Sequence, residues 1–165
     1  MSVVSTLRQA DIFYEFTLTQ LELIASICTE HVYNLGDIIF EENTTGDELY
    51  VIVDGEIDIQ VDPSLVGKPV AGEPQTIATL RRGQSFGEVA LVDEGVRSAR
   101  AVAAKVDTRV LLIPRDKLML MCDSYPHMGY RLMRNLAGDL AMKIRNTDLK
   151  VREYLTWRHD EPKAP

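Results

Sequence analysis

The fold of this chain is decided by residues 48–62, ELYVIVDGEIDIQVD. Residues 48–53 and 56–61 are rich in β-branched and aromatic side chains, which favour extended strands. In the second run apolar side chains alternate with polar ones, which predicts one buried face and one wet face. The Asp54-Gly55 pair between the runs is typical of a two-residue hairpin turn in which both residues have positive φ. The stretch therefore predicts two strands joined as a β-hairpin.

Strand-like runs also occur on both sides of this hairpin. They span residues 37–41, 75–80, 99–104 and 108–113. Residues 63–74 contain three prolines and two glycines, so we expect a surface loop there between two hairpin strands. Strands at intervals of roughly 8–12 residues, with turns between them, are typical of a sandwich or barrel.

Helical patterns lie before and after the strands. Thr17 followed by Gln20 has the form of a capping box, and apolar residues then recur at helical spacing. After Pro114 a short helical run is followed by a long one that opens at Pro126, where proline is acceptable in the first turn.

The fold class we expect is α+β: an eight-stranded β-barrel or jelly roll flanked by N-terminal helices and a long C-terminal helix. The expected bounds are about 5–30 for the N-terminal helices, about 31–114 for the barrel, about 115–158 for the C-terminal helices and 159–165 for a tail, all within a single domain 1–165.

The long C-terminal helix carries a heptad seam. Its members follow a 4-3-4-3-4-3 spacing: Met133, Ala137, Leu140, Ile144, Thr147, Val151 and Tyr154. The seam is apolar except at Thr147. It can pack on the barrel of its own chain or on the same helix of a second copy, and we expect a homodimer through this helix.

Composition excludes several classes of partner. The formal net charge of −7 argues against general nucleic-acid binding, which needs a basic face, so we expect no direct DNA binding. No apolar run approaches the roughly 18 residues that a membrane span needs, and the start of the chain does not resemble a secretory signal. Cys28 and Cys122 lack metal-ligand spacing and are expected to be buried free thiols. We therefore expect a cytoplasmic protein that does not contact membranes.

Catalysis is not expected. A metal-dependent cupin enzyme needs clustered histidines with an acid on adjacent strands, and only His31 falls near the predicted barrel. The sequence also offers no nucleophile elbow and no histidine partner for triad chemistry. We expect a binding protein that is not an enzyme and that has no catalytic residues, metal or cofactor.

The segment with the most informative chemistry is residues 83–99, GQSFGEVALVDEGVRSA. A turn of helix starting near Val89 would present free backbone N–H groups and the positive end of its dipole to an anion. Arg97 can neutralise a phosphate with a planar fork of donors. The small Gly87 lets a ligand approach the backbone, and an ionised Glu88 can accept a hydrogen bond from a hydroxyl.

This segment resembles the phosphate-binding cassette of the cyclic-nucleotide-binding domain family, in its Phe86-Gly87-Glu88 start and its Arg97-Ser98-Ala99 end. The nine-residue step from Glu88 to Arg97 is similar to that in protein-kinase regulatory subunits. Residues 36–41 and 46–55 resemble the family's early barrel strands and glycine turns, and the likeness covers about residues 12 to 155. The long C-terminal helix looks like the C-helix of the bacterial catabolite-activator branch, without that branch's helix-turn-helix reader.

The resemblance implies a set of ligand-binding residues. They are Gly87, Glu88, Val89, Ala90, Leu91, Arg97, Ser98, Ala99, Thr147 and Asp148. Within this set Glu88 would hold the ribose 2′-hydroxyl with help from the Gly87 amide. Arg97 and the backbone amides of Ala90, Leu91 and Ser98 would hold the cyclic phosphate.

Thr147 and Asp148 fall where the activator branch has a Thr-Ser pair that contacts the purine N6 group. Asp148 departs from serine, and Thr147 could instead bond back to its own helical turn. Ser98 could donate to the phosphate or to a guanine N2 group. Mainly because of Thr147, we expect cAMP to be favoured over cGMP.

The resulting prediction is a stand-alone regulatory sensor that binds a cyclic purine mononucleotide, cAMP or cGMP, and reorients its C-terminal helix for an unknown effector protein. Tyr154 and Trp157 could stack on the purine, or could simply be packed or exposed. The alternative is a degenerate scaffold or dimerisation module without a nucleotide, in which Glu88 and Arg97 form a structural surface ion pair.

Overall fold

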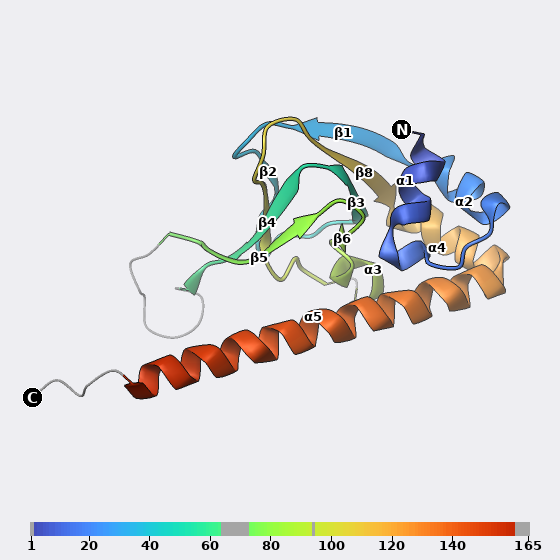
Figure 1. Cartoon of the computed structure of the whole chain (residues 1–165). Helices are drawn as coiled ribbons and strands as arrows, with labels where there is room; N and C mark the ends of the chain where they lie inside the picture. The colour runs from blue at the N-terminus through green and yellow to red at the C-terminus, as the bar shows by residue number, and fades with distance from the viewer. Residues whose placement is uncertain (1, 64–72, 94, 161–165) are drawn as a thin grey trace, which may run out of the picture.

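The computed structural model describes residues 2–63, 73–93 and 95–160. Its elements in chain order are α1 (Val3–Gln9), η1 (Asp11–Phe13), α2 (Leu18–Ala25), β1 (Thr29–Tyr33), β2 (Ile38–Phe40), β3 (Glu48–Asp54), β4 (Glu56–Val61), β5 (Gln75–Arg81), β6 (Ser85–Phe86), α3 (Val89–Asp93), β7 (Arg100–Ala103), β8 (Thr108–Pro114), α4 (Arg115–Ser124) and α5 (Pro126–Asp160). Helices α1, α2 and α4 gather at one end of the strands, and α5 runs along the strand region as one long helix (Figure 1).

The strands form two antiparallel sheets. One has the order β1-β8-β3-β6 and the other the order β2-β7-β4-β5. The predicted α+β fold with a long C-terminal helix is therefore confirmed. The predicted closed barrel is not, because the described residues form two separate four-stranded sheets. The predicted loop at 63–74 lies largely outside the described residues, but the two strands on either side of it, β4 and β5, pair antiparallel as expected.

Strand β3 is buried on both faces. Leu49, Val51 and Val53 belong to the core that the strands share with the helices. Tyr50 and Ile52 belong to a second core, which lies between the two sheets. A strand covered on both faces needs apolar side chains at successive positions. The unbroken apolar run therefore places β3 at the centre of the molecule.

The predicted hairpin at Asp54-Gly55 is wrong. Strands β3 and β4 belong to different sheets, so the chain crosses from one sheet to the other at this corner. Gly55 has φ +88°, but Asp54 is not among the residues with positive φ. The positive φ of Gly55 was predicted correctly, but a residue that favours a turn does not specify which strands pair with each other.

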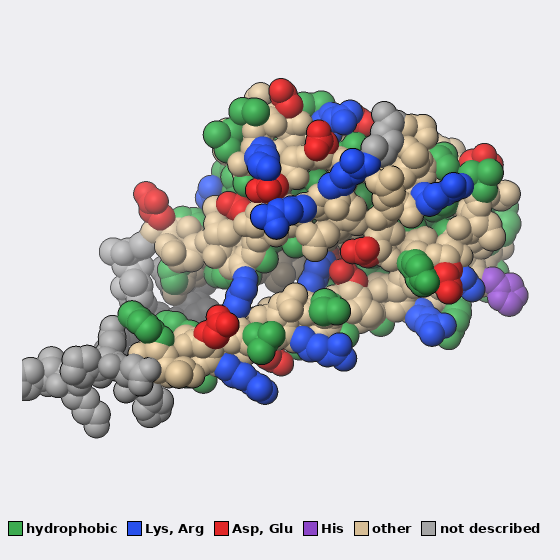
Figure 2. All heavy atoms as spheres, in the orientation of Figure 1, with side chains coloured by type: hydrophobic (Ala, Val, Ile, Leu, Met, Phe, Trp, Pro, Cys, Tyr) green, Lys and Arg blue, Asp and Glu red, His purple; other side chains and the backbone are tan. Residues whose placement is uncertain are grey.

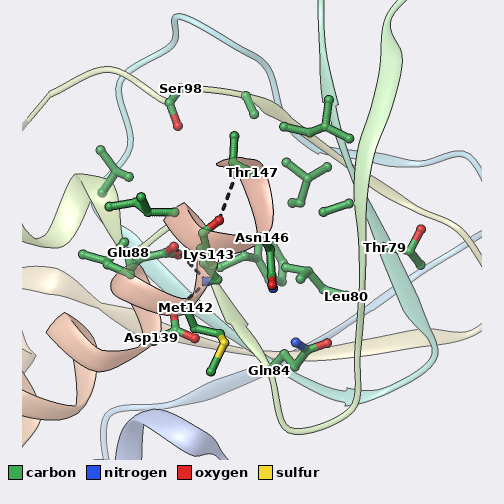
Figure 3. A pocket seen from close by; sticks show the side chains of 18 of the residues that line it. Thr79, Leu80, Gln84, Glu88, Ser98, Asp139, Met142, Lys143, Asn146 and Thr147 are labelled. Carbon is green, nitrogen blue, oxygen red and sulfur yellow. Dashed lines mark hydrogen bonds and ion pairs between the residues drawn. The ribbon is translucent and has the colours of Figure 1, made fainter. Parts of the chain in front are cut away.

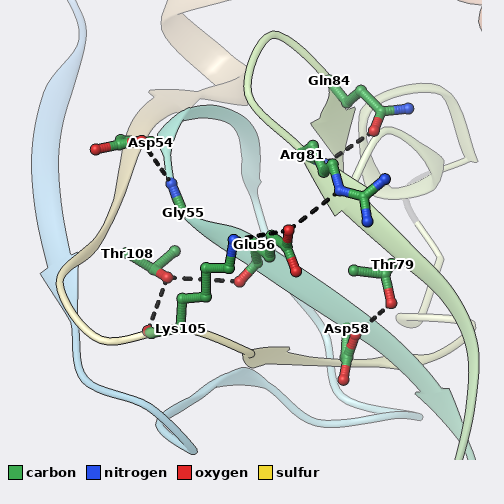
Figure 4. Close-up of polar contacts among 9 residues, drawn as sticks. All are labelled: Asp54, Gly55, Glu56, Asp58, Thr79, Arg81, Gln84, Lys105 and Thr108. Carbon is green, nitrogen blue, oxygen red and sulfur yellow. Dashed lines mark hydrogen bonds and ion pairs between the residues drawn. The ribbon is translucent and has the colours of Figure 1, made fainter.

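Polar contacts stabilise this corner (Figure 4). The Glu56 carboxylate lies 2.9 Å from the Lys105 ammonium and 3.1 Å from Arg81 Nε. These cations lower the pKa of Glu56 below its ordinary value, Lys105 having the larger effect. The Thr108 hydroxyl donates to the Lys105 carbonyl at 2.9 Å.

The N-terminal helices form as the sequence predicts, but they end earlier. Thr17 Oγ1 accepts from the Gln20 amide at 3.3 Å, and Gln20 Oε1 accepts from the Thr17 amide at 3.0 Å, which confirms the capping box. Helix α2 ends at Ala25, and β1 begins at Thr29. This edge strand was not predicted, because four of its five residues are exposed and carry no alternating apolar pattern.

The first half of helix α5 packs against the end of the molecule where α1, α2 and α4 gather. Met128, Leu132 and Leu136 are each no more than 1% exposed. The Asn135 amide donates to the carbonyls of Ile12 and Tyr14 at 3.0 and 2.9 Å. The first half of α5 is therefore anchored to the N-terminal segment. In the part of the chain that is described, no helix has the length and apolar character to cross a membrane.

Candidate functional site

A pocket of about 820 Å³ lies between α5, the sheet β2-β7-β4-β5 and the segment around α3. Among the residues that line it are eight of the predicted ligand-binding residues: Gly87, Glu88, Val89, Arg97, Ser98, Ala99, Thr147 and Asp148. The structure thus brings the two ends of the 83–99 segment together with α5, which is about 50 positions later in the chain.

Leu91 differs from the expectation. Its backbone amide donates to the Glu88 carbonyl at 3.0 Å, and its side chain is 3% exposed in the core shared with the helices. This amide is therefore already bonded, to the residue that precedes the short helix α3. The side chain of Ala90 lies outside what the structure describes.

Arg97 is buried, with 2% of its surface exposed. Its Nη1 donates to the Gly87 carbonyl at 3.0 Å, and its Nη2 donates to the Glu48 carbonyl at 3.1 Å and lies 3.4 Å from the Glu48 carboxylate. The third nitrogen, Nε, carries one N–H donor; it is buried and has no hydrogen-bond partner among the described residues. A buried unpaired donor on a cation is costly unless an acceptor approaches it.

The backbone around Arg97 fixes the position of its side chain. The Arg97 amide donates to the Thr44 carbonyl at 2.7 Å, and the Arg97 carbonyl accepts from the Asn43 amide at 2.8 Å. The guanidinium lies between Gly46 and Gly87, and a Cβ added to Gly87 would lie only 2.7 Å from Nη1. Glycine at these positions is what allows the guanidinium to lie against the backbone.

Glu88 is also buried, at 6% exposed, and it pairs with a cation from α5. The Lys143 ammonium lies 2.8 Å from Glu88 Oε1 and 2.7 Å from Asp139 Oδ2, and it donates to the Ser85 carbonyl at 2.9 Å (Figure 3). Burial by itself lowers the pKa of Lys143, but the two carboxylates outweigh it and raise the net pKa above the ordinary value. Lys143 is therefore held in its charged form.

These contacts contradict the idea that Glu88 and Arg97 form a structural surface ion pair. Both side chains are buried, and each has a different charged partner, Lys143 for Glu88 and Glu48 for Arg97. A buried cation and a buried carboxylate thus line the same pocket.

Comparison with known proteins agrees with this arrangement. The family described as "Cyclic nucleotide-binding domain" matches residues 30–125, which include Glu88 and Arg97 and extend from β1 to the end of α4. This chain belongs to the cyclic nucleotide-binding domain family.

Relatives of this cyclic nucleotide-binding domain occur in bacteria and animals. The chain is 30% identical over 145 residues to the cyclic AMP receptor protein of Thermus thermophilus, covering 88% of this chain and 62% of that protein. It is 31% identical over 154 residues to mouse cGMP-dependent protein kinase 2, covering 92% of this chain and 19% of the kinase. The chain therefore spans less than two thirds of the length of either relative.

The fold of this chain also matches that of a solved relative. The catabolite activator protein of Thermus thermophilus aligns with a TM-score of 0.71 at 29% identity, covering 88% of this chain and 63% of that one. The domain thus shares its fold with a protein whose sequence is also related.

Helix α5 presents a polar face to the pocket of this cyclic nucleotide-binding domain. Five lining residues follow a 4-3-4-3 spacing along it: Asp139, Lys143, Asn146, Lys150 and Glu153. This face was not predicted, because the apolar seam, some of whose members also line the pocket, gives the more conspicuous pattern. The signal was present in the polar residues with the same period. The Lys150 ammonium contacts the Ile77 carbonyl on β5, so α5 also meets the far wall of the pocket.

Thr147 and Asp148 lie at the edge of this face and line the pocket. The Thr147 hydroxyl donates to the Lys143 carbonyl at 3.0 Å, which is the bond to its own helical turn that the sequence left open. The Thr147 oxygen keeps its acceptor capacity, because a hydroxyl that donates one bond can still accept.

The heptad seam divides into two halves. Met133 and Leu140 pack against the helical core of their own chain. Ile144, Val151 and Tyr154 are 61%, 50% and 56% exposed. Ile144 also lines the pocket. The second half of α5 presents apolar side chains among charged ones on its surface (Figure 2). Trp157 is likewise 62% exposed.

Proposed function

We propose that this pocket binds a cyclic purine mononucleotide and that the chain acts as a regulatory sensor, with neither catalysis nor a further cofactor. The observation that carries the proposal is that one pocket is lined by both Arg97 and Glu88. A guanidinium supplies donors to a phosphate, and a carboxylate accepts from a ribose hydroxyl. The pocket volume of about 820 Å³ also lies in the usual range for small ligands, roughly 300–1,000 Å³.

The unpaired Nε of Arg97 supports the assignment of the phosphate site. The other two nitrogens hold the guanidinium in place through the Gly87 and Glu48 carbonyls, which leaves Nε as a buried donor. A phosphate oxygen in the pocket would neutralise the charge, and it would reach Nε if the Gly46 backbone, which packs against the guanidinium, moved aside. Ser98, which also lines the pocket, could add a hydroxyl or an amide to the same oxygens.

Adenine is the base that the α5 side of the pocket favours. The Thr147 hydroxyl already donates to the Lys143 carbonyl, so toward a ligand it acts as an acceptor. An ionised Asp148 is also acceptor-only. The 6-amino group of adenine can donate to both, whereas the 6-carbonyl of guanine is an acceptor and would find no donor in this pair. The proposal is therefore that cAMP is preferred over cGMP.

The proposed output is a change in the position of α5. The ligand would contact both the 83–99 segment and α5. It would therefore bind best when these two parts are close together, and it would shift the population toward that arrangement. The exposed apolar side chains of Val151 and Tyr154, which do not line the pocket, supply a surface for a second copy or an effector. We propose a homodimer through this surface. Light scattering at tens of micromolar should give the mass of a dimer, and the mass of a monomer would contradict it.

Thermal unfolding tests the proposed ligand. A ligand that binds the folded state raises its stability by about 2.7 kcal/mol when present at 100 times its Kd. We expect cAMP to raise Tm more than cGMP does, and we expect 5′-AMP, whose phosphate is not cyclised, to have much less effect. If millimolar cAMP and cGMP both leave Tm unchanged, the proposal fails and the scaffold alternative is favoured.

A further inference from the structure

We propose that Lys143 is a positioning residue of the site: it holds the Glu88 carboxylate in place, and it joins α5 to the carboxylate that the ribose would use. This inference rests on the proposed function. It concerns a residue on α5, beyond the 30–125 segment that the family description matches.

The contacts of Lys143 come from three parts of the chain. Its ammonium meets the Ser85 carbonyl on β6 at 2.9 Å, Glu88 Oε1 just before α3 at 2.8 Å, and Asp139 Oδ2 on α5 at 2.7 Å. An ammonium has three donors, and here it has three oxygen neighbours. Figure 3 shows the Lys143 side chain reaching from α5 to lie between the two carboxylates.

Charge explains why Glu88 needs this partner. A carboxylate that is only 6% exposed pays a large desolvation cost unless a cation pairs with it. Lys143 supplies that cation by bonding Glu88 Oε1, and a carboxylate has lone pairs left on both oxygens for a ribose 2′-hydroxyl.

Geometry explains why the helix is involved. Asp139 lies one turn before Lys143 on α5, so their i,i+4 contact orients the ammonium along the helix surface toward Glu88. The ribose hydroxyl and the Lys143 ammonium of α5 would then both bond the Glu88 carboxylate. Coupling of this kind is reciprocal, so a ligand that bonds Glu88 should strengthen the docking of α5, and docked α5 should strengthen ligand binding.

The test combines a change in the protein with a change in the ligand. Titration calorimetry of wild type and Lys143→Met is carried out with cAMP and with 2′-deoxy-cAMP, which lacks the hydroxyl that Glu88 would bind. A hydrogen bond to a charged group changes affinity by roughly tenfold or more. We expect wild type to bind 2′-deoxy-cAMP more weakly than cAMP by about that factor. Lys143→Met should bind cAMP more weakly than wild type does, by a similar factor. In this variant the affinities for cAMP and 2′-deoxy-cAMP should differ little.

Three controls separate positioning from general damage. Lys143→Arg keeps the cation and should restore the dependence on the 2′-hydroxyl. Arg145→Met removes a positive charge from an exposed position on the same helix and should leave both affinities unchanged. Lys143→Gln replaces the methionine variant if the latter does not fold.

Hydrogen exchange of the second half of α5 gives an independent readout. In wild type cAMP should slow exchange there more than 2′-deoxy-cAMP does, and in Lys143→Met the two ligands should act alike. If wild type binds cAMP but Lys143→Met keeps the full dependence on the 2′-hydroxyl, the inference about Lys143 is wrong while the proposed function stands. If wild type binds neither nucleotide, both are overturned.

Discussion

The guanidinium carbon of Arg97 lies 4.4 Å from the centre of the Phe40 ring. A desolvated cation–π contact of this kind contributes about 2 kcal/mol. Together with the two carbonyl bonds of Arg97, the contact fixes the guanidinium before any ligand arrives. The proposed phosphate site is therefore preorganised, and binding would not have to order a flexible arginine.

Removing the guanidinium should weaken nucleotide binding strongly. Arg97→Ala should cost about 2–5 kcal/mol of cAMP binding free energy, because a desolvated phosphate loses its charged partner. Arg97→Lys should recover only part of this, since an ammonium cannot reproduce the planar fork. Calorimetry measures both, with Arg109→Ala as the control, since Arg109 is partly exposed and pairs with Glu30 on β1. Unchanged affinity in Arg97→Ala would show that the site is wrongly assigned.

Base preference should respond to Asp148. Asp148→Asn replaces an acceptor-only group by an amide that can also donate, so it can serve the 6-carbonyl of guanine. We expect the ratio of cAMP to cGMP affinity to fall by about twofold to tenfold, the value of an ordinary hydrogen bond. Competition of both nucleotides against a fluorescent cAMP analogue measures the ratio. A ratio equal to that of wild type would remove Asp148 from base recognition.

Two glycines with the same backbone angle should respond differently to alanine. Gly36 and Gly55 both have φ +88°, but a Cβ at Gly36 has no neighbour within 4 Å, while one at Gly55 would lie 2.9 Å from Thr108 Cα. Gly36→Ala should cost only the backbone strain, about 1–2 kcal/mol. Gly55→Ala should cost a further 1–3 kcal/mol or so for the overlap in a packed corner. Urea unfolding compares the two, and equal costs would contradict the packing of the β3–β4 corner.

The sequence predicted the elements of this fold better than their pairing. The apolar run of β3 and the capping box at Thr17 depend on local chemistry, and both were predicted correctly. The hairpin at Asp54-Gly55 was wrong because a turn signal does not say whether the next strand returns beside the last one or crosses to another sheet. Strand β1 was missed because it is mostly exposed.

The candidate site was predicted best where its residues are close in sequence. Glu88 and Arg97 belong to one segment, and the structure places both at the pocket. Lys143 was missed because its importance comes from contact with Glu88, 55 positions earlier, and no local pattern reports such a contact. Asp139 was missed because it acts through its ion pair with Lys143. On α5 the apolar period drew attention to the seam, but the pocket is lined both by seam residues and by the polar residues beside them.

The cysteine thiols should be slow to react in the folded protein. Burial raises the pKa of Cys28 to about 12, and burial followed by the charge of Asp123 raises the pKa of Cys122. A thiol reacts as its thiolate, so at pH 8 only about one Cys28 in ten thousand is reactive. A thiol-specific dye should therefore label the native protein slowly and both cysteines quickly in urea. Rapid labelling of the native protein would contradict the packing of the helical core around Cys28.

The central claim is that the pocket between Arg97, Glu88 and α5 holds a cyclic nucleotide, and calorimetric titration of the whole chain with cAMP tests it most directly. The account predicts saturable heat that fits one site per chain and that is weaker with cGMP. It also predicts that Arg97→Ala loses most of this affinity. Absence of saturable heat with either nucleotide at millimolar concentration would contradict it.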